Sequence, residues 1–197
     1  MEPNPPCPQL AGLSRAKSLC FTGHRPEKLP QNEMLQGLRQ TLQHYILRAV
    51  LKGYTSFYTG LADGVDYLAA DILFGLRLVK PQIIVIGVQP CADYEEFYYR
   101  RGYDMQHLYA MLNQIDRHII LPGSARDPGI FLRRNDFMVE HSAAIIAVCD
   151  NRRSGSMYTL NYAKRRGLAY CRIYPRPPEN TIPPVQQWPV EMGVART

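Results

Sequence analysis

The residues of this chain that could do chemistry gather in three short segments rich in glycine and small polar side chains. The first segment reads Thr22-Gly23-His24-Arg25-Pro26. Glycine lets the backbone approach a ligand closely, and the histidine and arginine side chains supply hydrogen-bond donors for a phosphate or a ribose. A tight turn that carries a surface arginine is the alternative interpretation.

The second segment covers residues 59–70 and contains Gly60, Asp63, Gly64 and Asp66. Two glycines four residues apart, just before a predicted helix, leave backbone N–H groups free at the helix N-terminus, where the dipole favours an anion. The spacing predicts a phosphate-binding loop that is neither a G-x-G-x-x-G fingerprint nor a Walker loop. Asp66 would either favour the helix dipole or accept hydrogen bonds from ribose hydroxyls.

The third segment, residues 150–159, supplies small hydroxyl side chains and a glycine before another predicted helix. Ser154, Ser156 and Thr159 are candidate donors around Gly155, which makes this loop a second candidate anion site. Upstream, Arg134 and Asn135 lie on a predicted helix from which both could reach the same place, with surface charge as the alternative.

These segments need a scaffold that brings them together, and the hydrophobic pattern provides one. Short apolar runs predict strands, and three- and four-residue apolar spacings predict helices between them. The predicted strands are 18–22, 56–59, 83–88, 118–121, 143–149 and 169–174, and the predicted helices are 32–52, 65–78, 93–113, 130–140 and 156–166. This alternation predicts a single α/β domain, a Rossmann-like doubly wound, mainly parallel sheet with helices on both faces, which binds ligands beyond the carboxyl ends of its strands.

Length and composition fit one domain that binds an anionic partner. The chain has 197 residues, 46% of them hydrophobic, and a formal net charge of +6. We expect a flexible proline-rich N-terminal tail at 1–15, the nucleotide-binding domain at 16–174 and a proline-rich C-terminal tail at 175–197. The sequence has no membrane span and no export signal, and its odd number of cysteines does not indicate a disulfide framework. We therefore expect a cytoplasmic protein without membrane contact. Self-association into a homo-oligomer stays open.

Side chains outside the three segments give weaker indications of function. The remaining histidines show no metal-ligand spacing, so we expect no metal site, and magnesium only alongside a polyphosphate ligand. No other cofactor is indicated. An aromatic cluster accompanies Arg100 and Arg101 on the predicted helix 93–113, and its members are Tyr94, Phe97, Tyr98, Tyr99 and Tyr103. We expect these rings to pack against the sheet, with stacking on a base or on single-stranded nucleic acid as the alternatives.

Together the three segments resemble the YpsA family of the SLOG superfamily, which also includes the Lonely Guy (LOG) phosphoribohydrolases and the DNA-processing protein DprA. The resemblance covers residues 16–174 and includes the Ala-Asp-Gly-Val-Asp core at 62–66 and the run from Arg134 to Thr159. It implies a nucleotide-like ligand held by Gly23, Arg25, Gly60, Gly64, Asp66, Arg134, Asn135, Gly155, Ser156 and Thr159.

The chain departs from the LOG enzymes where their chemistry lies. Matching Thr159 to the threonine of their Pro-Gly-Gly-x-Gly-Thr-x-x-Glu pattern puts Tyr158 in place of the last glycine and Tyr162 in place of the catalytic glutamate. Arg134 matches and is the candidate catalytic residue, while Asp136, Glu140 and Asp150 are candidate replacements for the acid.

We therefore expect a sensor or regulatory protein that binds a nucleotide or nucleotide derivative, and whether it is an enzyme stays open. The alternative is a LOG-like phosphoribohydrolase that cleaves the N-glycosidic bond of a nucleoside 5′-monophosphate. Binding of single-stranded nucleic acid ranks third.

Overall fold

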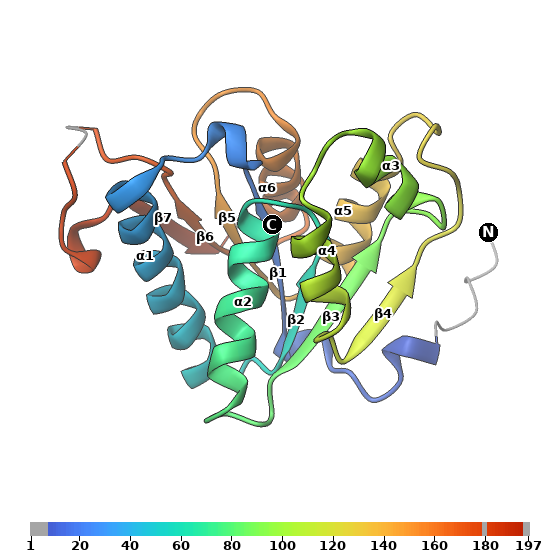
Figure 1. Ribbon diagram of the computed structural model, residues 1–197. Helices are drawn as coiled ribbons and strands as arrows, with labels where there is room; N and C mark the ends of the chain where they lie inside the picture. The colour runs from blue at the N-terminus through green and yellow to red at the C-terminus, as the bar shows by residue number, and fades with distance from the viewer. Residues whose placement is uncertain (1–7, 179–180, 195–197) are drawn as a thin grey trace.

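A computed structural model of the chain describes residues 8–178 and 181–194 (Figure 1). In this part of the chain, seven strands form one sheet in the order β4-β3-β2-β1-β5-β6-β7. Strands β1 to β6 are parallel, and β7 runs antiparallel to β6 at the edge. The strands are β1 (Ser18–Gly23), β2 (Ser56–Thr59), β3 (Ile84–Gln89), β4 (Arg117–Ile120), β5 (Ala144–Val148), β6 (Ala169–Ile173) and β7 (Val190–Val194).

Helices cover both faces of the sheet (Figure 1). One face carries α1 (Asn32–Leu51), α2 (Val65–Arg77), α3 (Tyr94–Arg100) and α4 (Met105–Leu112), and the other carries α5 (Ile130–Glu140) and α6 (Gly155–Arg165). Successive strand residues point to opposite faces, so Leu19 and Phe21 join the core under α1 and α2, whereas Cys20 joins the core under α5 and α6. The predicted doubly wound α/β fold is confirmed.

The strand order changes direction between β1 and β5. From β1 the chain adds β2, β3 and β4 on one side and then returns to place β5 on the other side of β1. The two strands pair in register from Leu19 opposite Ala144 to Gly23 opposite Val148. In sheets of this kind, a crevice opens outside the carboxyl ends of the two strands at the reversal. Two of the three polar segments follow these two strands.

The predicted strands and four of the five predicted helices agree with the structure to within one residue at each end. The prediction of one helix over 93–113 is wrong, because α3 ends at Arg100 and α4 starts at Met105. Gly102 between them has a φ of +66°, which is incompatible with a continuous helix. Asp104 then caps α4 by accepting hydrogen bonds from the N–H groups of Gln106 and His107.

Both ends of the chain contribute to the fold more than expected. Strand β7 lies in the predicted C-terminal tail, and so does Trp188, which is 3% exposed and packs over Gly37. In the predicted N-terminal tail, Leu10 packs against the core on the α5 and α6 face; residues 1–7 lie outside the described part. None of the helices in the described ranges has the length and apolarity needed to cross a membrane.

Candidate functional site

A polar pocket of about 200 Å³ opens beyond the carboxyl ends of β1 and β5. We call it the inner pocket. Its walls come from the loop after β1, the start of α2, helix α5 and the start of α6. Ten of the predicted ligand-binding residues line it: Thr22, Gly23, His24, Arg25, Asp66, Arg134, Asn135, Ser154, Gly155 and Ser156. The structure thus brings together residues from all three segments and from helix α5.

Four predicted residues, Gly60, Asp63, Gly64 and Thr159, do not line the inner pocket. Conversely, the pocket includes Phe21, Glu27, Lys28, Ala62, Phe131 and Leu132, which the sequence reasoning did not select. Glu27 and Lys28 come directly after Pro26, the last residue of the first segment. Their charge and their position next to that segment were the signal that could have identified them. The apolar side chains of Phe131 and Leu132 gave no signal that separates them from core residues.

The floor of the pocket holds two buried opposite charges. Asp66 is 7% exposed and Arg134 is 5% exposed. Burial raises the pKa of the Asp66 carboxyl group, although Arg134, Arg25 and the backbone hydrogen bonds from Ala62 and Gly60 oppose the shift. The guanidinium group of Arg134 donates from Nη1 to the Gly60 carbonyl oxygen and from Nε to Asn135 Oδ1, the latter at 2.8 Å.

Gly60 supports this floor because it has no side chain. A Cβ atom there would overlap both the Arg134 guanidinium group and the Asp66 carboxylate. Gly23 has a similar role on β1, where a Cβ atom would overlap Val65 at the start of α2. The two glycines therefore let protein groups pack closely.

The turn at 60–64 is not the free phosphate cradle that its spacing predicted. The N–H groups of Gly60 and Ala62 donate to the Asp66 carboxylate. The N–H of Leu61 donates to Thr59 Oγ1 at 3.4 Å, and that of Gly64 donates to Asp63 Oδ1 at 2.8 Å. The amide donors of Gly60, Leu61, Ala62 and Gly64 are thus used inside the protein, because the side chains of Asp66, Thr59 and Asp63 accept from them.

Asp63 connects the same turn to helix α4. Its Oδ1 atom lies 2.9 Å from His107 Nδ1, and the His107 ring stacks on Tyr67 with 3.8 Å between ring centroids. Asp63 therefore anchors the turn at 60–64 to helix α4. His107 is a packing residue here, in agreement with the expectation for the histidines outside the motifs.

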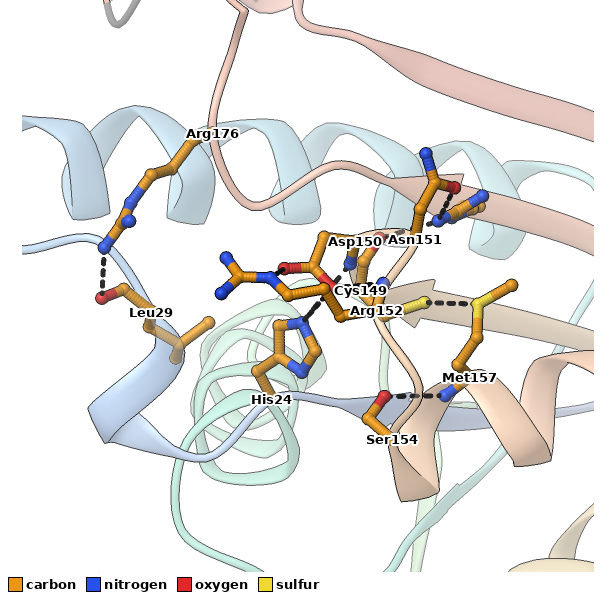
Figure 2. A network of polar contacts seen from close by, with 10 residues as sticks. His24, Leu29, Cys149, Asp150, Asn151, Arg152, Ser154, Met157 and Arg176 are labelled. Atoms are coloured by element: carbon orange, nitrogen blue, oxygen red, sulfur yellow. Dashed lines mark hydrogen bonds and ion pairs between the residues drawn. The ribbon is translucent and has the colours of Figure 1, made fainter.

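The start of α6 offers the donors that the turn at 60–64 does not. Ser154 is the N-cap residue, and its Oγ accepts the N–H of Met157 at 3.2 Å (Figure 2). Within the described residues, the N–H groups of Gly155 and Ser156 and the Ser156 hydroxyl have no hydrogen-bond partner. Ser156 is 8% exposed and lines the inner pocket. These groups lie at the positive end of the helix dipole, which favours an anion.

Thr159 positions this helix end and does not touch the pocket. The side chain is fully buried, and its hydroxyl donates to the Gly155 carbonyl oxygen at 2.9 Å. The Thr159 hydroxyl oxygen itself accepts a hydrogen bond from Asn135 Nδ2 at 2.9 Å. Asn135 in turn accepts from Arg134, so a chain of hydrogen bonds connects α6 to the pocket floor.

His24 joins the loops that follow β1 and β5. It is 3% exposed, and its Nε2 accepts the backbone N–H of Asp150 at 3.2 Å (Figure 2). Burial lowers the pKa of His24, against the opposing influence of the Asp150 carboxylate. With Nε2 accepting, the neutral ring carries its proton on Nδ1.

Arg25 brings positive charge to the pocket. Its guanidinium group lies 4.7 Å from the centroid of the Tyr103 ring, and its Nη1 atom is buried without a hydrogen-bond partner in the described ranges. Arg25, Lys28 and Arg134 outnumber Asp66 and Glu27 among the charged residues that line the pocket. The arrangement therefore suits a ligand group that carries negative charge and accepts hydrogen bonds.

The candidate replacements for the LOG glutamate lie elsewhere. The hydroxyl groups of Tyr158 and Tyr162 donate to Asp136 and Glu140, at 3.3 and 2.7 Å, and none of these four residues lines the inner pocket. Asp150 Oδ2 accepts from Arg152 at 2.8 Å. Asp66 and Glu27 are thus the carboxylates of this pocket.

The aromatic cluster packs as expected for its central members. Tyr94 and Tyr98 are fully buried, and the Tyr94 hydroxyl donates to the Leu61 carbonyl oxygen at 3.1 Å. Tyr99 is 72% exposed and takes no part in this packing. Among the described residues, no group of three or more histidine, cysteine, aspartate or glutamate side chains is arranged to hold a metal ion.

Comparison with known proteins agrees with this architecture. A sequence model of the YpsA family, described as the YspA SLOG family, matches residues 19–170. An uncharacterized SPbeta prophage-derived protein of Bacillus subtilis, YoqJ, is 29% identical over 133 residues, which are 60% of this chain and 76% of the relative. A UPF0398 protein of Bacillus cereus is 25% identical over 158 residues, 77% of this chain and 84% of the relative.

Two solved structures are similar to this chain. DprA from Streptococcus pneumoniae superposes with a TM-score of 0.50 and 18% identity over 78% of this chain. DprA from Helicobacter pylori, described for its single-stranded DNA binding mode, gives a TM-score of 0.49 and 20% identity over 75% of this chain. The matched regions are 48% and 60% of those two proteins, so this chain spans about half the length of the first.

Proposed function

The chain belongs to the YpsA family of SLOG proteins, and from this membership and the site geometry we propose that the inner pocket binds a phosphate-bearing nucleotide or nucleotide derivative. The protein then acts as a sensor or regulatory protein, because the acid on which LOG chemistry depends is replaced by Tyr162. We assign the function to a reducing compartment, the cytoplasm, because the four described cysteines are all free.

One observation carries the proposal: unused hydrogen-bond donors converge on a positively charged pocket at the strand-order reversal. The N–H groups of Gly155 and Ser156 have no acceptor among the described residues, and Arg25, with its unpartnered Nη1, lines the same pocket. The Arg25 Nη1 atom is buried, and buried donors are rarely left unpaired in proteins because each unpaired donor costs about 1–3 kcal/mol. A phosphate group offers these donors both acceptor oxygens and negative charge.

Each part of the site has a role in this proposal. The start of α6 and the Arg25 guanidinium group bind the phosphate. The hydroxyls of Thr22 and Ser156, which have no hydrogen-bond partner in the part of the chain described, are available to the sugar. Asp66 and Arg134 stiffen the floor through their contacts with the turn at 60–64.

Isothermal titration calorimetry with AMP, ADP-ribose, NAD and inorganic phosphate tests the proposal. The informative variant is Arg25→Met, and Arg101→Met is its matched control, because the Arg101 guanidinium group also lies over an aromatic ring, 5.3 Å from the Phe97 centroid, but does not line the pocket. A hydrogen bond to a charged group contributes about 1.5–3 kcal/mol. We therefore expect Arg25→Met to weaken binding at least about tenfold and Arg101→Met to bind like the wild type.

Absence of binding to all four probes would contradict the proposal. Equal affinities of Arg25→Met and Arg101→Met would show that Arg25 does not contribute to ligand binding.

Hydrolysis of an N-glycosidic bond is the second candidate function, and one observation favours it. Asp66 is a carboxyl group in the pocket whose pKa is raised by burial, a property of general acids. Chromatography after incubation with AMP separates the two functions, since a sensor returns AMP intact and a hydrolase releases adenine and ribose 5-phosphate. If turnover occurs, we expect Asp66→Asn to abolish it.

A salt titration distinguishes both functions from binding of single-stranded nucleic acid. An oligonucleotide would have to contact exposed basic side chains such as Arg152 and Arg153 outside the pocket. Its affinity would fall steeply with salt concentration, because each phosphate contact releases counterions. The affinity of a single nucleotide whose phosphate lies in the inner pocket depends on salt concentration far less.

A further inference from the structure

The inner pocket is too small for the whole ligand proposed for it. Its volume is about 200 Å³, whereas pockets that enclose small organic ligands measure about 300–1,000 Å³. A phosphate and part of a sugar fit this space. The remainder of a nucleotide must lie in an adjoining space.

A second cavity, which we call the outer cavity, adjoins the inner pocket. It measures about 670 Å³ and shares Leu132, Ser154 and Gly155 with the inner pocket. Two other cavities of the molecule, one between α1 and the β6–β7 edge and one beside α3, share no lining residue with the inner pocket. The outer cavity therefore offers the ligand an extension around the start of α6.

Gly155 lies where the two cavities meet. A Cβ atom at this position would have no atom within 4 Å, so the packing of the protein does not require a glycine. The absence of a side chain leaves the space between the cavities clear for a ligand.

The outer cavity has a rigid aromatic side chain in its wall. Tyr158 is 37% exposed, its hydroxyl donates to Asp136 at 3.3 Å, and its ring lies parallel to that of Tyr162, with 6.4 Å between centroids and 8° between planes. These two contacts hold the ring in one orientation. A flat apolar surface of this kind stacks well on a planar heterocycle.

Polar side chains complete the outer cavity. Asn151 and Asn161 carry amide groups that both donate and accept hydrogen bonds. Arg172 Nη2 donates to Asn151 Oδ1 at 2.8 Å, which fixes the Asn151 side chain and leaves its NH₂ group available. Amides beside an aromatic ring match the mixed donors and acceptors along the edge of a nucleobase.

We infer that the base of the bound nucleotide lies in the outer cavity and stacks on Tyr158, while its phosphate lies in the inner pocket. The inference rests on the proposed function and specifies its ligand class: a nucleoside phosphate recognised through both its base and its phosphate. Tyr158 is then a specificity-determining residue.

Calorimetric titrations with AMP and with ribose 5-phosphate, which lacks the base, test the inference. The variants are Tyr158→Ala, Tyr158→Phe and the control Tyr99→Ala, which removes an exposed tyrosine that lines neither cavity. Circular dichroism confirms that each variant is folded. We expect Tyr158→Ala to weaken AMP binding about tenfold and to leave ribose 5-phosphate binding unchanged. Tyr158→Phe, which keeps the ring, should bind AMP more tightly than Tyr158→Ala, and Tyr99→Ala should bind AMP like the wild type.

Two results would contradict the inference. The first leaves the phosphate site intact, and the second contradicts the proposed function as well. If ribose 5-phosphate and AMP bind equally well and Tyr158→Ala changes neither affinity, the base does not occupy the outer cavity, although the phosphate site stands. If neither compound binds to the wild type, the proposed function fails and the inference fails with it.

Discussion

Replacing Gly64 or Gly155 by alanine separates a glycine that the fold needs from a glycine that the pocket needs. Gly64 precedes α2 with φ +92° and ψ −125°, a conformation that residues with a side chain rarely adopt. An alanine Cβ there would lie 3.0 Å from the Arg25 Cα atom and closer still to the His24 carbonyl oxygen. Both atoms belong to the backbone, so no side-chain rotation relieves the overlap.

The expected magnitudes follow from these geometries. For Gly64→Ala, backbone strain costs about 1–3 kcal/mol and the steric overlap costs about 1–3 kcal/mol. Alanine also lowers the entropy of the unfolded chain, which stabilises the folded state by about 0.4–1 kcal/mol. The net loss in the free energy of unfolding is about 1–5.5 kcal/mol, or roughly 2–22 °C in Tm at 2–4 °C per kcal/mol. For Gly155→Ala the steric and strain costs are absent, so stability rises by about 0.4–1 kcal/mol.

Urea denaturation followed by circular dichroism gives both free energies. We expect Gly64→Ala to unfold at a clearly lower urea concentration than Gly155→Ala. If Gly64→Ala lies within about 1 kcal/mol of the wild type, the assigned backbone conformation is wrong. The pair also guides binding experiments, because loss of ligand binding in a Gly64 variant reports on folding, whereas the same loss in folded Gly155→Ala reports on the pocket.

Three further predictions concern the charges and the edge of the fold. Asp93 accepts hydrogen bonds from Ser124 and from the Ala125 N–H, which lower its pKa from 3.8 to about 2. Asp93→Asn should therefore destabilise the protein at pH 7. In thermal melts at a series of pH values, the stability difference between wild type and variant should vanish as the pH falls from about 4 to 2. Burial lowers the pKa of His24 below 6.5, so its stabilising contribution is present above that pH and is lost as the pH falls; the stability difference between wild type and His24→Gln should narrow between pH 7 and pH 5, and a constant difference would contradict the neutral His24. Trp188→Ala should cost about 3–5 kcal/mol in urea denaturation, whereas a loss below 1 kcal/mol would mean that the C-terminal segment is not part of the core.

The strands and most helices could be predicted because their hydrophobic pattern is strong. Strand β5 is buried along its whole length, and α1 buries Leu38, Leu42 and Ile46 at helical spacing. Strand β7 gave a weak signal, since Val190, Met192 and Val194 alternate with a glutamate and a glycine in a proline-rich region. It pairs with β6, and Trp188 just before it packs over Gly37; both are long-range contacts that local patterns do not encode.

The candidate site was predictable in its location and less so in its chemistry. The reversal of strand order brings the loops after β1 and β5 together, and the sequence indicated both. It did not indicate which donors stay free, because this depends on which side chain reaches which N–H group. Asp66 turns back onto the turn at 60–64 and uses its amides, whereas Ser154 takes only one amide of α6 and leaves two unused.

The most direct test of a phosphate site at the start of α6 is an NMR titration of ¹⁵N-labelled protein with AMP. We expect the amide resonances of Gly155 and Ser156 to show the largest downfield shifts as AMP is added, with smaller changes at Arg25. Shifts that leave both α6 amides unchanged while resonances elsewhere move would show that the nucleotide binds outside the inner pocket and would contradict the proposed site.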